Sequence, residues 1–110
     1  MLRENHKMNR LEQLKKLLAD TPGDSFITFA IAKEYEKTGD TDEALKHYLM
    51  IAEHEPKYVG LYYHLGKLYE ERGDIAAAIS TYEQGMKVAK TVGDDHAFSE
   101  LAGAKMAVDS

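Results

Sequence analysis

The chain has no cysteine among its 110 residues, and this absence excludes several kinds of chemistry. Without a thiol it can form no disulfide bond, no thiolate metal site and no cysteine nucleophile. Long apolar runs are also absent: none approaches the ~20 residues that cross a bilayer, and the N-terminus lacks the apolar core of a signal peptide. We therefore expect a cytoplasmic protein with no membrane partner.

Positive charge is scarce as well. Lys and Arg number 14 against 19 Asp and Glu, so the net charge is −5, which disfavours a surface made for phosphate groups. Five of the basic residues nevertheless lie within residues 1–16, beside two Glu. A basic start of this kind could contact nucleic acid or acidic lipid, but it is more typical of the solvated face of a helix. We expect no nucleic-acid partner.

What the sequence does contain is one stretch that occurs twice, at a single fixed offset. The matching pairs are Tyr35 and Tyr69, Gly39-Asp40 and Gly73-Asp74, Ala44 and Ala78, and Tyr48 and Tyr82. A fixed period of about 34 residues is typical of arrays in which each repeat is a pair of helices. The sequence therefore predicts an all-α protein built from repeats.

The second copy resembles the tetratricopeptide repeat family, in its small bacterial form. The matching string of an aromatic residue, Leu, Gly and Tyr consists of Tyr62, Leu65, Gly66 and Tyr69. In the first copy Thr28, Ile31 and Ala32 replace the first three of these residues. The resemblance implies a right-handed α-solenoid of antiparallel helix pairs, and a non-catalytic scaffold that binds a protein or peptide.

We expect one domain over residues 1–110 with about six helices. It would comprise an N-terminal half-repeat over 1–22, repeat 1 over 25–58, repeat 2 over 59–92 and a capping helix within 93–110. The first helix is expected over about 6–20, with the apolar stripe Met8, Leu11, Leu14, Leu17 and Leu18. It corresponds to the second half of a repeat, because Pro22 precedes Pro56 by the same offset that separates the two copies.

The helix periodicity also predicts which side chains face inward. They are Ile27, Ile31, Ala32, Tyr35, Ala44, Leu45, Tyr48, Ile51, Ala52, Leu61, Tyr62, Leu65, Leu68, Tyr69, Ile75, Ala78, Ile79, Tyr82, Met86, Val88 and Ala89, followed by the stripe Phe98, Leu101, Ala102 and Met106. Asp40 and Glu43 are expected to form a capping box. Gly85 stands where alanine is usual, and a backbone contact with the next helix is one explanation.

No catalytic or metal-binding motif accompanies this pattern. The five histidines form no metal-ligand string such as His-Glu-x-x-His, and the chain has no Gly-rich phosphate loop. His47 and His54 lie seven residues apart, on a side of their helix that we expect to face outward. The many carboxylates fall on positions expected to be exposed. The sequence predicts no enzyme, no metal and no cofactor.

In the family, the leading helix of each repeat lines a concave groove, and the resemblance implies the same here. Both repeats place an aromatic residue one turn before a lysine, a pattern that could hold a peptide with an acidic group. The implied partner-binding residues are Phe29, Lys33, Lys37, Tyr63, His64 and Lys67, with Ala30, Glu36, Glu70 and Glu71 at neighbouring groove positions.

Other interpretations remain open. Phe29 could pack against the N-terminal helix, with both lysines merely solvated. The half-repeats could instead dock on one another as a homodimer, because such arrays usually need about three units to be stable. One subfamily is not matched: members that dock the C-terminus of heat-shock chaperones use a clamp of Lys and Asn, and three of those places hold Phe29, Lys33 and His64.

Overall fold

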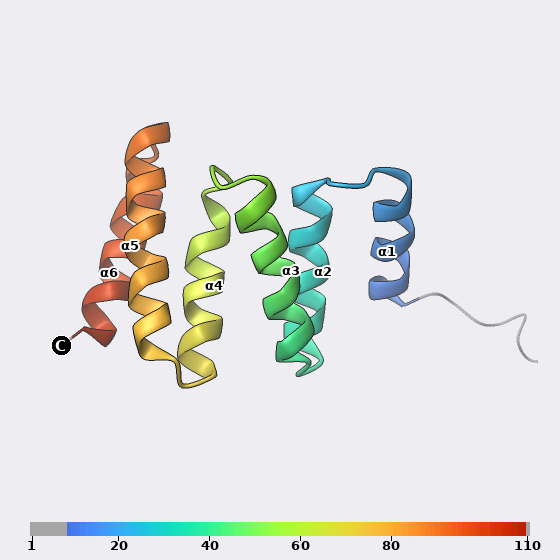
Figure 1. Ribbon diagram of the computed structural model, residues 1–110, viewed down its shortest axis with the longest axis horizontal. Helices are drawn as coiled ribbons and strands as arrows, with labels where there is room; N and C mark the ends of the chain where they lie inside the picture. Colours follow the sequence, from blue (N-terminus) through green and yellow to red (C-terminus); the bar gives the residue numbers. More distant parts are fainter. Residues whose placement is uncertain (1–8, 110) are drawn as a thin grey trace, which may run out of the picture.

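The computed structural model describes residues 9–109, which form six helices joined by short turns (Figure 1). The helices are α1 (Arg10–Asp20), α2 (Ser25–Lys37), α3 (Thr41–His54), α4 (Gly60–Glu71), α5 (Ile75–Val92) and α6 (Asp95–Val108). The closest packing joins α2 to α3, α4 to α5, and α5 to α6, while α1 packs on α2. The predicted all-α fold of six helices packed in pairs is confirmed.

Four of the helices begin at the aspartate of a Gly-Asp pair. Each aspartate side chain accepts a hydrogen bond from the backbone amide three residues further on, at 3.0 to 3.3 Å, which satisfies one free amide of the first turn. Each preceding glycine has a positive φ, a conformation that other residues rarely adopt. These pairs are Gly23-Asp24, Gly39-Asp40, Gly73-Asp74 and Gly93-Asp94.

The predicted capping box at Asp40 is only half present. The Glu43 amide donates to the Asp40 side chain, but the Asp40 amide donates to the Tyr35 carbonyl at 2.9 Å, in the turn that closes α2. A complete capping box occurs instead at the start of α1, between Asn9 and Glu12. Asn9 is extended and caps α1, which begins at Arg10. The earlier part of the predicted first helix, with Met8, lies outside the described residues.

The interior is built around three tyrosines, Tyr48, Tyr62 and Tyr82, none more than 1% exposed. The hydroxyl of Tyr48 donates to Glu36 Oε1 at 2.5 Å, and that of Tyr82 donates to Glu70, at the same positions one repeat later. Burial raises the pKa of both tyrosines, and the neighbouring carboxylate raises it further. Both phenols therefore keep their protons and remain hydrogen-bond donors.

Two glycines allow the helices of the second repeat to approach closely. A Cβ atom on Gly66 would overlap the Tyr82 ring, and one on Gly85 would overlap Tyr62 Cβ. Leu101 of α6 also reaches to 3.0 Å of that second position. The atoms nearest to Gly85 are thus side-chain atoms of Tyr62 in α4 and Leu101 in α6, and not the backbone of the next helix as expected.

Three residues predicted to face inward are exposed: Leu17 at 52%, Ile75 at 41% and Met106 at 72%. Leu17 lies beside the face by which α1 packs on α2, where no described helix covers it. Ile75 is the first residue of α5, at the end of the helix pair. Met106 lies five residues beyond the buried Leu101 and thus about 140° around α6.

Gly85→Ala tests the close packing of α4, α5 and α6. The new methyl group cannot fit against Tyr62 Cβ without moving a helix, so we expect the free energy of unfolding to fall by roughly 1–3 kcal/mol. Gly103→Ala is the matched control, because Gly103 lies in α6 with open space around it, and it should gain roughly 0.5–1 kcal/mol. Urea unfolding followed by circular dichroism measures both. Equal stability of the two variants would contradict the packing described.

Candidate partner-binding groove

The leading helices α2 and α4 meet through an aromatic cluster on their shared side. The rings of Phe29 and His64 lie 5.1 Å apart between centroids, edge to face. Lys33 Nζ lies 3.3 Å from His64 Nδ1, so the lysine donates to the imidazole. The structure thus brings three of the predicted groove residues together.

Phe29 packs between the helices more than it faces solvent. It is half-buried, and its ring also lies 5.7 Å from the rings of Tyr48 in α3 and Tyr58 in the turn before α4. The ring contacts therefore come from α3, α4 and the turn between them. An aromatic residue packed in this way positions α4 against the first helix pair.

The exposed aromatic residue on α2 is Phe26, which the sequence reasoning missed. Its side chain is 72% exposed. Lys33 and Lys37 follow it by seven and eleven residues, spacings that return to the same side of a helix. The same periodicity that identified the core could have found this strip, had it been applied to the outward positions. Phe26, Lys33 and Lys37 together are called the α2 strip below.

On α4 the corresponding lysine is held in place by its neighbours. Lys67 Nζ lies 5.6 Å from the centre of the Tyr63 ring and 3.8 Å from Glu70 Oε2. The Lys67 side chain is nevertheless 45% exposed. In contrast, Lys33 and Lys37 form no ion pair with any residue of the described range 9–109.

Two of the three groove carboxylates lie deeper than the lysines. Glu36 and Glu70 are half-buried and accept hydrogen bonds from the hydroxyls of Tyr48 and Tyr82. The expectation that these two carboxylates are exposed is therefore wrong. Lys33, Lys37 and Lys67 are exposed. Glu71, at a neighbouring groove position, is also exposed, so a molecule approaching this side meets three ammonium groups and one carboxylate.

His64 stands at the centre of this charge pattern. Burial lowers the pKa of His64 below its ordinary 6.5 and Lys33 lowers it further, while Glu36 and Glu100 act in the opposite direction. A neutral imidazole can accept a hydrogen bond from the Lys33 ammonium at Nδ1, whereas an imidazolium would face a second cation. Glu100 belongs to α6, so that helix also contributes to the electrostatics of the groove.

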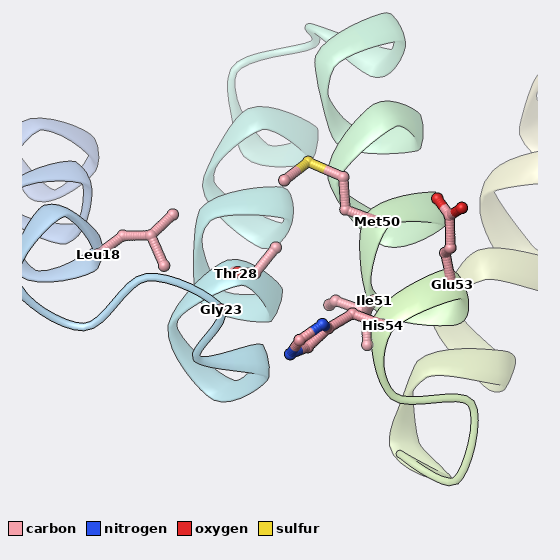
Figure 2. A pocket seen from close by; sticks show the side chains of 7 residues that line it. All are labelled: Leu18, Gly23, Thr28, Met50, Ile51, Glu53 and His54. Atoms are coloured by element: carbon pink, nitrogen blue, oxygen red, sulfur yellow. The ribbon is translucent and has the colours of Figure 1, made fainter.

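A second depression lies between α1 and α3 (Figure 2). It has a volume of about 390 Å³, and Figure 2 shows Leu18 entering from α1, Thr28 from α2, and Met50 and His54 from α3. One repeat later, Tyr62 stands in the place of Thr28, with its ring against Gly85 and its hydroxyl donating to the Pro56 carbonyl at 2.5 Å. The depression thus follows from a small residue standing where the second repeat has an aromatic one.

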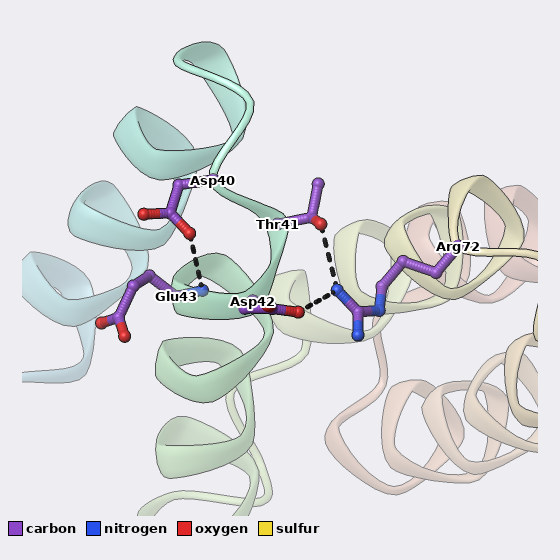
Figure 3. A network of polar contacts seen from close by, with 5 residues as sticks. All are labelled: Asp40, Thr41, Asp42, Glu43 and Arg72. Carbon is purple, nitrogen blue, oxygen red and sulfur yellow. Dashed lines mark hydrogen bonds and ion pairs between the residues drawn. The ribbon is translucent and has the colours of Figure 1, made fainter.

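A polar network joins the pair α2–α3 to the pair α4–α5, at the end of the helices opposite to this depression (Figure 3). Arg72 Nη1, just after α4, donates to Asp42 Oδ1 at 2.8 Å and to Thr41 Oγ1 at 3.0 Å at the start of α3. Asp42 is 84% exposed, and ion pairs of this kind contribute little free energy. These hydrogen bonds join the end of α4 to the start of α3 and do not form a chemical site.

The predicted outward side of α3 is only partly exposed. The ring of His47 is half-buried and lies 5.4 Å from that of Tyr35, with Nδ1 2.8 Å from the Glu43 carbonyl oxygen. His54 is exposed as expected. Within residues 9–109, no group of three or more His, Asp or Glu side chains is arranged to hold a metal ion. No helix in this same range is both long enough and apolar enough to cross a membrane.

Known proteins are similar to this chain in sequence. A family model described as the tetratricopeptide repeat matches residues 59–91. A repeat-containing protein of that kind from Pseudomonas aeruginosa is 35% identical over 91 residues, which cover 83% of this chain and 87% of the relative.

Solved structures agree with these sequence matches. The crystal structure of a tetratricopeptide repeat domain protein from Salinibacter ruber is similar with a TM-score of 0.74 and 42% identity, covering 78% of this chain and 96% of that one. The solution structure of a protein from Bordetella parapertussis has a TM-score of 0.81 and 26% identity, covering 94% and 90%.

The lowered pKa of His64 predicts a loss of stability in mild acid. In the unfolded chain His64 takes up a proton as the pH falls through about 6.5, whereas the folded protein resists protonation until a lower pH. The free energy of unfolding should therefore decrease as the pH falls below about 6.5, and more steeply than in the variant His64→Gln. Urea unfolding at a series of pH values measures the difference. Parallel curves for the wild type and His64→Gln would refute this prediction. His96→Gln, at an exposed position in α6, serves as the control.

Proposed function

Because the chain belongs to the tetratricopeptide repeat family, whose members are typically non-catalytic protein-interaction modules, we propose that it is a scaffold for another protein. It binds an acidic peptide or protein segment on the side shared by α2 and α4. The observation that carries this proposal is the α2 strip, in which Phe26 is 72% exposed and two lysines lack an ion pair within residues 9–109.

The α2 strip and the α4 residues supply complementary kinds of contact. Phe26 offers apolar area, and burial of an aromatic side chain by a partner is a common source of binding free energy. Lys33, Lys37 and Lys67 offer charge to a carboxylate, which favours correct alignment and rapid association more than affinity. A ligand with an apolar residue next to acidic ones fits both features.

His64 and Phe29 act in this proposal mainly as supports. They hold α2 and α4 at a fixed separation, and the hydrogen bond from Lys33 to His64 keeps the ammonium group in place. A groove whose cations are already held in position loses less conformational entropy when it binds.

A second candidate function is self-association through the end helices. Leu17 of α1 and Met106 of α6 are 52% and 72% exposed, and neither belongs to the α2 strip. A dimer built on these residues would survive changes at Lys33 and Lys67, whereas a ligand of the groove would not.

Selection of peptides from a random display library tests the proposal without a known partner. Peptides retained by the wild-type protein should combine carboxylates with an apolar residue. They should bind the variant Lys33→Glu/Lys67→Glu at least about tenfold more weakly, a loss of about 1.4 kcal/mol. Phe26→Ser should weaken the same peptides through loss of apolar contact.

Lys16→Glu/Lys46→Glu is the matched control, because it makes the same change of charge at exposed positions on α1 and α3. The proposal fails if the control weakens binding as much as the groove variant. It also fails if the retained peptides carry no excess of acidic residues.

A further inference from the structure

The far end of the row of helices carries a second groove, between α5 and α6. It has a volume of about 510 Å³ and is lined by Glu83, Met86, Lys87, Lys90, Phe98 and Lys105. This groove shares no lining residue with the α2 strip or with the residues of α4 described above. We call it the α5–α6 groove.

Comparison with α2 indicates what such a groove accommodates. On the side of α2 that packs against α3, the side chains are almost completely buried: Thr28 at 5%, Ala32 at 0% and Tyr35 at 9%. Counted from the capping aspartates Asp24 and Asp94, the equivalent residues of α6 are Phe98, Ala102 and Lys105. All three are half-exposed. Within residues 9–109, α6 is thus a leading helix with no second helix packed on this side.

The charges around the groove restrict the kind of helix that fits. Met86 and Phe98 form an apolar floor, and three lysines surround it with Glu83 as the one acid in the lining. Lys90 Nζ lies 5.6 Å from the Phe98 ring, and Lys105 bonds Asp109 at 3.0 Å and lies 3.7 Å from Glu83. In a chain whose net charge is −5, this is a local surplus of positive charge.

We propose that the α5–α6 groove docks an amphipathic helix of another protein, with an apolar stripe between two rows of carboxylates. The helix takes the place that α3 takes on α2 and α5 takes on α4. Its apolar stripe covers Met86 and Phe98, and its carboxylates pair with Lys87 and Lys90. This interaction is separate from binding at the α2 strip, so either one can fail without the other.

The charge pattern also argues against a second copy of this chain as the occupant. The helix that matches the second half of a repeat and lacks a leading partner is α1, which carries three cations (Arg10, Lys15 and Lys16) and two acids (Glu12 and Asp20). A helix with a surplus of positive charge does not complement the lysines of the groove, because like charges in contact are unfavourable. The carboxylates of an acidic helix can form ion pairs with the same lysines.

The test uses the full chain and a designed probe. The probe is a synthetic peptide of about 18 residues, long enough to form a helix, with leucines along one side and glutamates on both flanks. A second peptide has lysine in place of every glutamate. Titration of ¹⁵N-labelled protein should shift the amide signals of Met86, Phe98 and Lys105 with the glutamate peptide and not with the lysine peptide.

Two variants with the same change of charge complete the design. Lys87→Glu/Lys90→Glu should weaken binding of the glutamate peptide at least about tenfold. Lys33→Glu/Lys37→Glu should leave the shifts at Phe98 and Lys105 unchanged, which separates this groove from the α2 strip.

Four results would overturn the inference. They are shifts confined to α2 and α4, equal binding of the lysine peptide, and no shift at millimolar peptide. The fourth is movement of the Phe98 and Lys105 signals on dilution of the protein alone, which would identify a second copy as the occupant.

Discussion

The contact between a tyrosine of the second helix and a small residue of the leading helix sets the geometry of each repeat. Tyr82 lies so close to Gly66 that no side chain fits between them, and Ala32 is fully buried at the same place in the first repeat. Both tyrosine hydroxyls then reach through to carboxylates on the groove side, Glu36 and Glu70. Because those carboxylates are drawn inward, the exposed charges of the groove are three lysines and one acid, Glu71.

The two repeats differ where one small residue is exchanged for a large one, and their surfaces differ accordingly. Tyr62 fills the space above Gly85 and joins α4, α5 and α6 into one packed unit. Thr28 leaves a depression of about 390 Å³ at the equivalent place, so α1 is joined less completely to α3. At the C-terminal end of the row of helices, α6 packs on α5, but no described helix covers the side of α6 that faces the α5–α6 groove. The surfaces available to partners are therefore set by the residues that interrupt the repeat.

The sequence predicts the helices well because their signals are local. Gly-Asp pairs mark four helix starts, and the repeat period places Tyr48 and Tyr82 inside the core in advance. Exposure at the ends is harder to predict, since periodicity cannot tell whether a neighbour covers a given side: Leu17 and Met106 match an apolar stripe but have no helix over them. The family pattern likewise selected Phe29 as the groove aromatic residue, whereas in the packed structure Phe29 is half-buried and Phe26 is exposed.

Binding of a partner on the side shared by α2 and α4 requires that this side is free in solution, and the molar mass tests this most directly. Light scattering on a sizing column, from low to high micromolar protein, measures it. A constant mass near 12.4 kDa is the predicted result, because the charged groove and the basic helix α1 do not favour a second copy. A mass near twice that value, lost on Lys33→Glu/Lys67→Glu, would show that the groove is filled by the protein itself and would contradict the account.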